Sequence, residues 1–169
     1  MAARQQHGQR PRSSADSRIR PPSASILKLS WLCSLLTRGF ATAADRLVGT
    51  ADFTRTDGTD AAVNFDWGDG SPGGTIGVDN FSARWTCDVG FTQAGIYRFT
   101  MRGDDGMRLF IRNNTTGART QVSPVGAWRN QGATTCTFDV PLTACTHRLE
   151  FEFYESGGQA SAQLSWVRL

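Results

Sequence analysis

Two adjacent carboxylates followed by a glycine, Asp104-Asp105-Gly106, are the residues of this chain best suited to chemistry. Calcium takes roughly six to eight oxygen ligands, so two carboxylates would leave coordination positions that the vicinal hydroxyls of a sugar could fill. Consecutive side chains of a strand point to opposite faces, and both carboxylates therefore reach one ion only where the backbone bends sharply, as at a cis peptide bond. The alternative is that the pair only shapes a turn and accepts hydrogen bonds from nearby backbone amides.

Four further residues are candidates for binding. Glu155 follows a predicted strand and could supply a third oxygen to the metal, although a solvated carboxylate at a strand end is the alternative. Trp128 lies in a polar loop, where it could stack on a sugar ring, but packing beneath the loop is the commoner role. Asn113 and Asn114 lie in a loop close to the aspartate pair in sequence, and could either contact a ligand or only form turns.

The elements that must position these residues are strands. From residue 61 onward apolar and polar residues alternate; in residues 147–155, for example, Leu149, Phe151 and Phe153 share one parity, and Glu150 and Glu152 the other. Clusters of Gly, Asp, Asn and Ser separate the runs, and no stretch sustains a helical period. Eight or nine strands, each with one solvent-facing side, predict an all-β fold. The expected architecture is an antiparallel, jelly-roll-like β-sandwich. The aromatic residues expected in its core are Trp67, Trp85, Phe99, Phe151, Phe153 and Trp166.

Charge is distributed unevenly along the 169 residues. Residues 1–48 contain eight basic and two acidic residues, a net charge of +6, whereas residues 49–169 contain ten basic and thirteen acidic residues, a net charge of −3. A mildly acidic folded part argues against nucleic acid as the partner, because phosphate binding needs a clustered basic face.

Residues 1–36 form a predicted leader, rich in Arg, Ser and Pro and disordered by composition. A short apolar run at 26–36 and the sequence Ala41-Thr42-Ala43 favour a secretory signal peptide with its cleavage site. A mitochondrial-type presequence and a translation start placed too far upstream are the alternatives. The apolar run is too short to span a membrane, so no membrane span is expected.

The cysteines do not have the spacing of a zinc site, because no Cys-x-x-Cys pair occurs. Cys136 and Cys145 enclose a short loop and are the favoured disulfide pair if the protein is secreted. Three free, buried thiols, with Cys87 as the third, are an equally good interpretation.

The order of several motifs resembles the anthrax protective-antigen-type domain, also called the "PA fourteen" domain, over residues 37–169. The resemblance rests on Phe65-Asp66-Trp67-Gly68, Asp79-Asn80-Phe81-Ser82-Ala83-Arg84-Trp85-Thr86, Gly95-Ile96-Tyr97-Arg98-Phe99-Thr100, Asp104-Asp105-Gly106-Met107-Arg108-Leu109-Phe110-Ile111, Trp128, His147, Phe153-Tyr154-Glu155, Gly157-Gly158 and Leu164-Ser165-Trp166.

The resemblance implies a β-sandwich that is generally not catalytic. In the fungal adhesin branch of that family, two adjacent aspartates joined by a cis peptide hold a calcium ion that binds sugar hydroxyls, and Asp104 and Asp105 match their position. A later loop supplies an asparagine ligand in those adhesins, and Glu155 or Ser156 falls nearest to it here. Arg112 and Asn113 depart from the Asp-Gly of many relatives.

These observations predict a secreted or cell-surface module that binds glycans, with Ca²⁺ as a possible cofactor, and not an enzyme. The hydrolase, P-loop and dinucleotide fingerprints do not occur, and adjacent aspartates cannot take the opposed positions of a glycosidase pair. The alternative is a structural domain that needs no metal and packs on itself or on another secreted protein.

Overall fold

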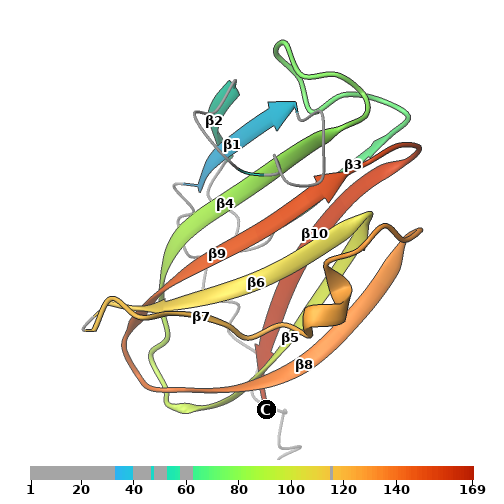
Figure 1. The fold of residues 1–169 in the computed structure, drawn as a ribbon. Helices are drawn as coiled ribbons and strands as arrows, with labels where there is room; N and C mark the ends of the chain where they lie inside the picture. Colours follow the sequence, from blue (N-terminus) through green and yellow to red (C-terminus); the bar gives the residue numbers. More distant parts are fainter. Residues whose placement is uncertain (1–32, 40–46, 48–52, 58–62, 115) are drawn as a thin grey trace, which may run out of the picture.

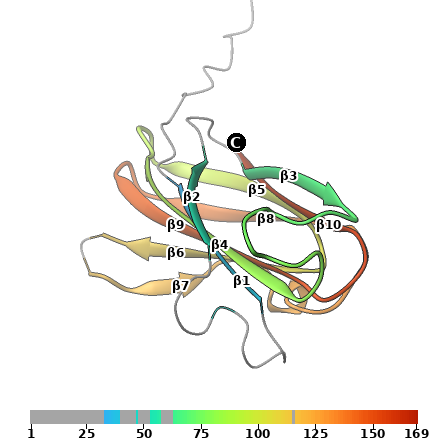
Figure 2. The same ribbon diagram turned by 90° about the horizontal axis from the view of Figure 1, so that it is seen from above.

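The computed structural model describes residues 33–39, 47, 53–57, 63–114 and 116–169, and it shows two antiparallel sheets packed face to face (Figures 1 and 2). One sheet has six strands in the order β2, β1, β4, β9, β6, β7, and the other has four in the order β3, β10, β5, β8. The predicted all-β sandwich is therefore confirmed.

The six-stranded sheet contains β1 (Cys33–Gly39), β2 (Phe53–Asp57), β4 (Phe81–Gly90), β6 (Gly106–Asn113), β7 (Arg119–Gln121) and β9 (Thr146–Glu155). The four-stranded sheet contains β3 (Val63–Gly68), β5 (Gly95–Asp104), β8 (Thr134–Leu142) and β10 (Ala160–Arg168). A short 3-10 helix, η2 (Val125–Ala127), lies between β7 and β8. Within the described ranges no helix is long and apolar enough to cross a membrane.

The core lies between the sheets and is rich in aromatic side chains, as the alternating pattern predicts. Trp85, Phe99, Phe151 and Phe153 are buried, and Trp67 and Trp166 are partly buried against them. Trp85 stacks on Phe151 with ring centroids 5.5 Å apart. Each large apolar side chain that is fully buried contributes about 1.5–3 kcal/mol, so this cluster accounts for much of the stability.

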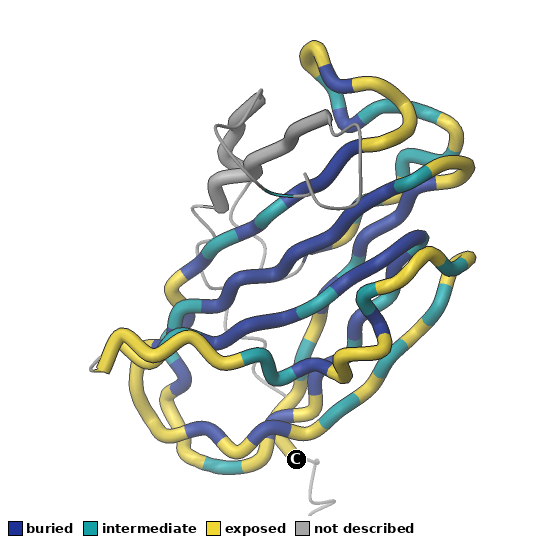
Figure 3. Tube along the Cα trace, viewed as in Figure 1, coloured by how far each residue is buried: buried dark blue, intermediate teal, exposed yellow. Residues whose placement is uncertain are grey.

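Strand β9 is buried along most of its length, on both faces (Figure 3). The inward parity of Leu149, Phe151 and Phe153 was predicted, but Glu150 and Glu152 on the opposite face are buried as well. Such burial on the outer face means that other side chains cover this sheet.

Two expectations differ from the structure. Strand β1 begins at Cys33, so residues 33–36 belong to the sheet and not to the leader; the rest of the leader and the expected cleavage site at 41–43 lie outside the described residues. The predicted disulfide between Cys136 and Cys145 is wrong, because both thiols are free, as is Cys87. Cys136 lies six residues before the end of β8, about 20 Å of strand from the turn that carries Cys145. Of the three, only Cys87 is buried.

Strand β1 lies between β2 and β4 in the sheet. Its contribution to stability can be tested by truncating the chain from the amino terminus. Removing residues 1–43 deletes β1 and its pairing with β4 over four residue pairs. We expect the free energy of unfolding to fall by roughly 2–4 kcal/mol, since each backbone hydrogen bond contributes about 1 kcal/mol. Urea unfolding of this variant, with one lacking only residues 1–32 as the control, measures the loss; equal stability of the two would contradict the position of β1.

Candidate functional site

The aspartate pair lies where the chain crosses from one sheet to the other, between β5 and β6 at one end of the sandwich (Figure 1). The peptide bond between Asp104 and Asp105 is cis. Two further connections meet it here: residues 129–133, which precede β8, and residues 156–159, which join β9 to β10.

The carboxylate of Asp105 holds these connections together. It is 6% exposed, and its two oxygens accept hydrogen bonds from two different loops: Oδ1 from the backbone N–H of Gln131 at 2.7 Å, and Oδ2 from that of Ser156 at 2.8 Å. The side-chain amide of Gln131 also donates to the backbone oxygen of Asp105 at 3.2 Å. Asp105 therefore accepts backbone amides, as the turn interpretation expected, but the donors are 26 and 51 residues away in sequence.

Asp104 is half-buried and lies beside this anchored carboxylate. Desolvation raises the pKa of its carboxyl group above the usual range, and the negative charge of Asp105 adds to the rise. The backbone N–H of Ala133 and the charge of Arg102 act in the opposite direction without cancelling it. The position thus favours a proton or a cation next to Asp104.

Glu155, the third acidic residue, is completely buried and not the solvated strand-end carboxylate of the alternative interpretation. Its Oε1 accepts a hydrogen bond from the backbone N–H of Gly157 at 2.5 Å, whereas its Oε2 is buried without a hydrogen-bond partner. Burial raises the pKa of this carboxyl group to about 8, with further contributions from the charges of Asp105 and Asp104. When Glu155 is protonated it can donate a hydrogen bond to Asp105, and this bond also raises the pKa of Glu155. When Glu155 is ionised, its Oε2 has no hydrogen-bond donor.

Gly106 is required by a close approach on the far side of the pair. A Cβ at this position would lie 2.1 Å from Cε1 of Tyr154, which is closer than real Cβ contacts. Tyr154 is buried, and its hydroxyl donates to Oδ1 of Asn130 at 2.9 Å. The glycine thus lets β6 run directly against Tyr154 and keeps the loop of residues 129–133 in place.

The predicted ligand contacts are brought together only in part. Ser156 lies in the cluster and contacts it through its backbone. Trp128 packs edge-on against Tyr154 with centroids 4.7 Å apart, and the guanidinium of Arg108 lies 4.0 Å above its ring, so the packing interpretation describes it. Asn113 and Asn114 are not near the pair, because they lie at the opposite end of β6, about 23 Å of strand away.

Asn113 instead forms the turn between β6 and β7. Its side chain accepts a hydrogen bond from the backbone N–H of Thr116 at 3.0 Å. Proximity in sequence misled the prediction, because eight residues of extended strand separate the two loops. Gln131 and Tyr154 were missed, since neither carries a signal in sequence that links it to a loop more than twenty residues away.

The carboxylates suit a hard cation by their chemistry, because ionised Asp104, Asp105 and Glu155 repel one another and one buried oxygen lacks a donor. Within the described part of the chain, however, no group of three or more His, Cys, Asp or Glu side chains is arranged to hold a metal ion. Any cation here would therefore depend on Asp104 and Asp105 together with backbone, water or ligand oxygens.

Comparison with known proteins agrees with the resemblance seen in the sequence. The family model described as "PA14 domain" matches residues 36–169. The anti-sigma-I factor RsgI3 of Acetivibrio thermocellus is 33% identical over 108 residues, which cover 63% of this chain but only 16% of that protein.

Solved structures show the same fold. An anti-sigma factor domain-containing protein superposes with a TM-score of 0.64 at 26% identity, covering 82% of this chain and 42% of that one. A PA14 sugar-binding domain from an RTX adhesin superposes with a TM-score of 0.55 at 22% identity, covering 82% of this chain and 90% of that one.

Replacing Asp105 by alanine tests its role as the anchor of the loops. The backbone N–H groups of Gln131 and Ser156 would lose their acceptor, and we expect the free energy of unfolding to fall by roughly 2–4 kcal/mol. Asp69→Ala in an exposed loop is the control and should change it by less than about 0.5 kcal/mol. Equal losses in urea unfolding would show that Asp105 does not anchor the loops.

Glu155 should make stability depend on pH in the absence of divalent ions. Its pKa is about 8 in the folded protein against 4.5 unfolded, so between these values the folded state holds a proton that the unfolded state has lost. Stability should therefore fall as pH rises through this window, by at most about 1.4 kcal/mol per pH unit. Thermal unfolding of Glu155→Gln should lack this decline and exceed the unsubstituted protein on the alkaline side; parallel profiles would contradict the assignment.

Proposed function

Because the chain belongs to the PA14 domain family, we propose that it is a carbohydrate-binding module that binds sugars through the loop cluster around Asp104 and Asp105. The observation that carries the proposal is the unbalanced charge of this cluster: the buried Glu155 Oε2 has no donor, and the carboxyl groups of Glu155 and Asp104 both have raised pKa values. A bound cation would remove this imbalance, and the ligand would share the cation.

Calcium fits this position better than a softer metal, because the side chains of Asp104 and Asp105 offer carboxylate oxygens as ligands and no sulfur or imidazole nitrogen. Asp104 and Asp105 would hold the ion, and the ion would offer its remaining coordination positions to two adjacent hydroxyls of a sugar. Asp105 keeps its two backbone partners in this arrangement, since each carboxylate oxygen has more than one lone pair. Asp104 is half-buried, which leaves it accessible to a ligand.

The rest of the cluster would position the sugar. Ser156 and Gln131 are half-buried and are held against Asp105 from opposite loops, and Asn130 is exposed beside them. The guanidinium of Arg108 covers one face of the Trp128 ring, so a sugar cannot stack on that face. Hydrogen bonds from the loops, rather than aromatic stacking, would therefore orient the sugar.

Names of similar proteins support the same class of ligand. The RTX adhesin domain is described as sugar-binding, and a β-glucosidase from Kluyveromyces marxianus contains the same fold, with a TM-score of 0.57 at 12% identity and 18% of that chain covered. A non-catalytic module exposed on a cell surface or secreted fits these relatives. Adjacent carboxylates are poorly placed for glycoside hydrolysis, which needs two carboxyl groups on opposite sides of the bond.

A second candidate role comes from the relatives described as anti-sigma factors. The chain matches 16% of RsgI3 and 42% of the solved anti-sigma factor domain-containing protein, so in those proteins the matching domain is one part of a longer chain. The domain could then bind a sugar outside the regulatory part and report its presence. Sugar binding is common to both roles.

Calcium and sugar binding are tested together by thermal unfolding and a glycan array. Calcium at a hundredfold excess over its Kd should stabilise the protein by about 2.7 kcal/mol, and glycan binding should be lost in a chelator. Asp104→Asn should abolish both effects, whereas the matched control Asp139→Asn, an exposed aspartate of β8, should retain them. No stabilisation by calcium, or an equal effect of the two substitutions, would contradict the proposed site.

A further inference from the structure

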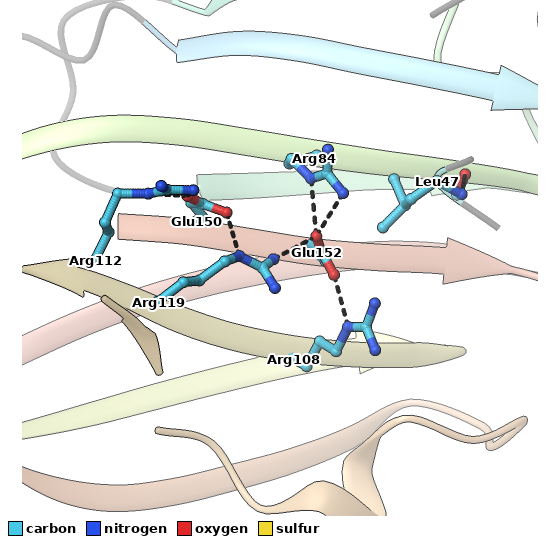
Figure 4. A network of polar contacts seen from close by, with 8 residues as sticks. Leu47, Arg84, Arg108, Arg112, Arg119, Glu150 and Glu152 are labelled. Carbon is cyan, nitrogen blue, oxygen red and sulfur yellow. Dashed lines mark hydrogen bonds and ion pairs between the residues drawn. The ribbon is translucent and has the colours of Figure 1, made fainter. Parts of the chain in front are cut away.

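A network of charged side chains covers the outer face of the six-stranded sheet (Figure 4). Its members come from four adjacent strands: Arg84 on β4, Glu150 and Glu152 on β9, Arg108 and Arg112 on β6, and Arg119 on β7. We call these six residues the arginine face. None of them belongs to the loop cluster of Asp104 and Asp105.

The two glutamates lie at the bottom of this network. Glu152 has no exposed side-chain surface; its Oε1 pairs with Arg84 and with Arg119, both at 2.8 Å, and its Oε2 pairs with Arg108 at 2.6 Å. Glu150 pairs with Arg119 at 2.6 Å and with Arg112 at 3.1 Å. Burial alone would raise the pKa of Glu150, but its hydrogen bonds and charge interactions with these arginines hold it below the usual range.

The positive charges form the outer layer. The side chains of Arg84, Arg108, Arg112 and Arg119 are 28–42% exposed, against 0% for Glu152 and 8% for Glu150. Four arginines against two glutamates leave a net charge of +2, carried by the accessible groups. A guanidinium has five N–H donors, and Arg108 uses only Nε on a carboxylate, so donors remain for a ligand.

Aromatic rings hold two of the guanidinium groups in place. Arg119 lies 3.4 Å above the ring of Phe110, and Arg108 lies 5.2 Å from the same ring and 4.0 Å from that of Trp128. Stacking and the shared glutamates fix these side chains before a ligand arrives, which reduces the entropy lost on binding. The face is therefore preorganised as well as positive.

The surroundings favour one class of polyanion. The exposed large apolar side chains of the residues whose burial is described are Val78, Ile96, Val125, Val167 and Leu169, and none lies on β4, β6, β7 or β9, the strands that carry the arginine face. A protein interface needs an apolar centre and a membrane-binding face needs insertable apolar residues, so neither fits well. A polysaccharide with acidic groups needs only charge and hydrogen bonds. The arginine face is a local cluster of basic groups, but residues 49–169 carry a net charge of −3, which disfavours the dense phosphate charge of a nucleic acid.

We propose that the arginine face binds a carboxylate-bearing polysaccharide, a polyuronate, without calcium. A guanidinium can match a planar carboxylate with two parallel N–H donors. On this face Arg84 directs both Nε and Nη2 at Oε1 of Glu152, each at 2.8 Å, so its guanidinium already binds a carboxylate oxygen of the protein. The uronate carboxylates would take the donors that the glutamates leave unused.

This face borders the loop cluster. Arg108 stacks on Trp128, and Trp128 packs on Tyr154, the residue before Glu155. One long polysaccharide could therefore contact both sites, although the arginine face needs neither the aspartates nor a metal ion.

Binding to alginate in the presence of a chelator tests the proposal on the full chain. We expect saturable binding that weakens with rising salt and survives Asp104→Asn, with no comparable binding to neutral dextran. Arg112→Gln should weaken it roughly tenfold, while Glu150 keeps Arg119 as a partner. The matched control Arg98→Gln, on the outer face of the other sheet, should bind alginate as the unsubstituted protein does.

Several outcomes would overturn the proposal. Loss of alginate binding in chelator or in Asp104→Asn would assign it to the loop cluster, and an equal loss in Arg98→Gln would make it a general charge effect. Preference for dextran sulfate, double-stranded DNA or poly-glutamate over alginate would reject the polyuronate. If Arg112→Gln does not fold, Arg108→Gln takes its place, because Glu152 retains Arg84 and Arg119.

Discussion

The buried carboxylate of Asp105 is the contact on which the functional end of the sandwich depends. It lies where β5 passes into β6, and it accepts backbone N–H groups from the loops that carry Gln131 and Ser156. Three connections that are distant in sequence are thereby held in one place. The same contact brings negative charge close to Glu155 and Asp104, and so creates the electrostatic imbalance that a cation would relieve.

Two buried glutamates of β9, three residues apart, illustrate how surroundings decide the state of a carboxyl group. Glu152 meets three guanidinium groups, whereas Glu155 meets a backbone amide and two further carboxyl groups. Both are fully buried, yet the first is satisfied and the second has an oxygen without a partner. The glutamates of the arginine face are therefore satisfied by partners within the protein, while the loop cluster is suited to an added cation.

Strand alternation and the family were predictable because both depend on local patterns: parity along a strand and motifs within ten residues. The aromatic core followed from the same parity. Contacts between residues on different strands and loops were not predictable. Asn113 is close to Asp105 along the chain but lies beyond a whole strand, and Cys136 is separated from Cys145 in the same way. The burial of Glu152 depends on arginines from three other strands, which no local pattern reveals.

In the proposed function, Asp104 and Asp105 hold a cation that is shared with a ligand. The most direct test is a crystal grown with calcium, with data collected for anomalous scattering. We expect an anomalous peak within about 2.3–2.6 Å of carboxylate oxygens of both aspartates. Ordered aspartates with no peak beside them at saturating calcium would contradict it.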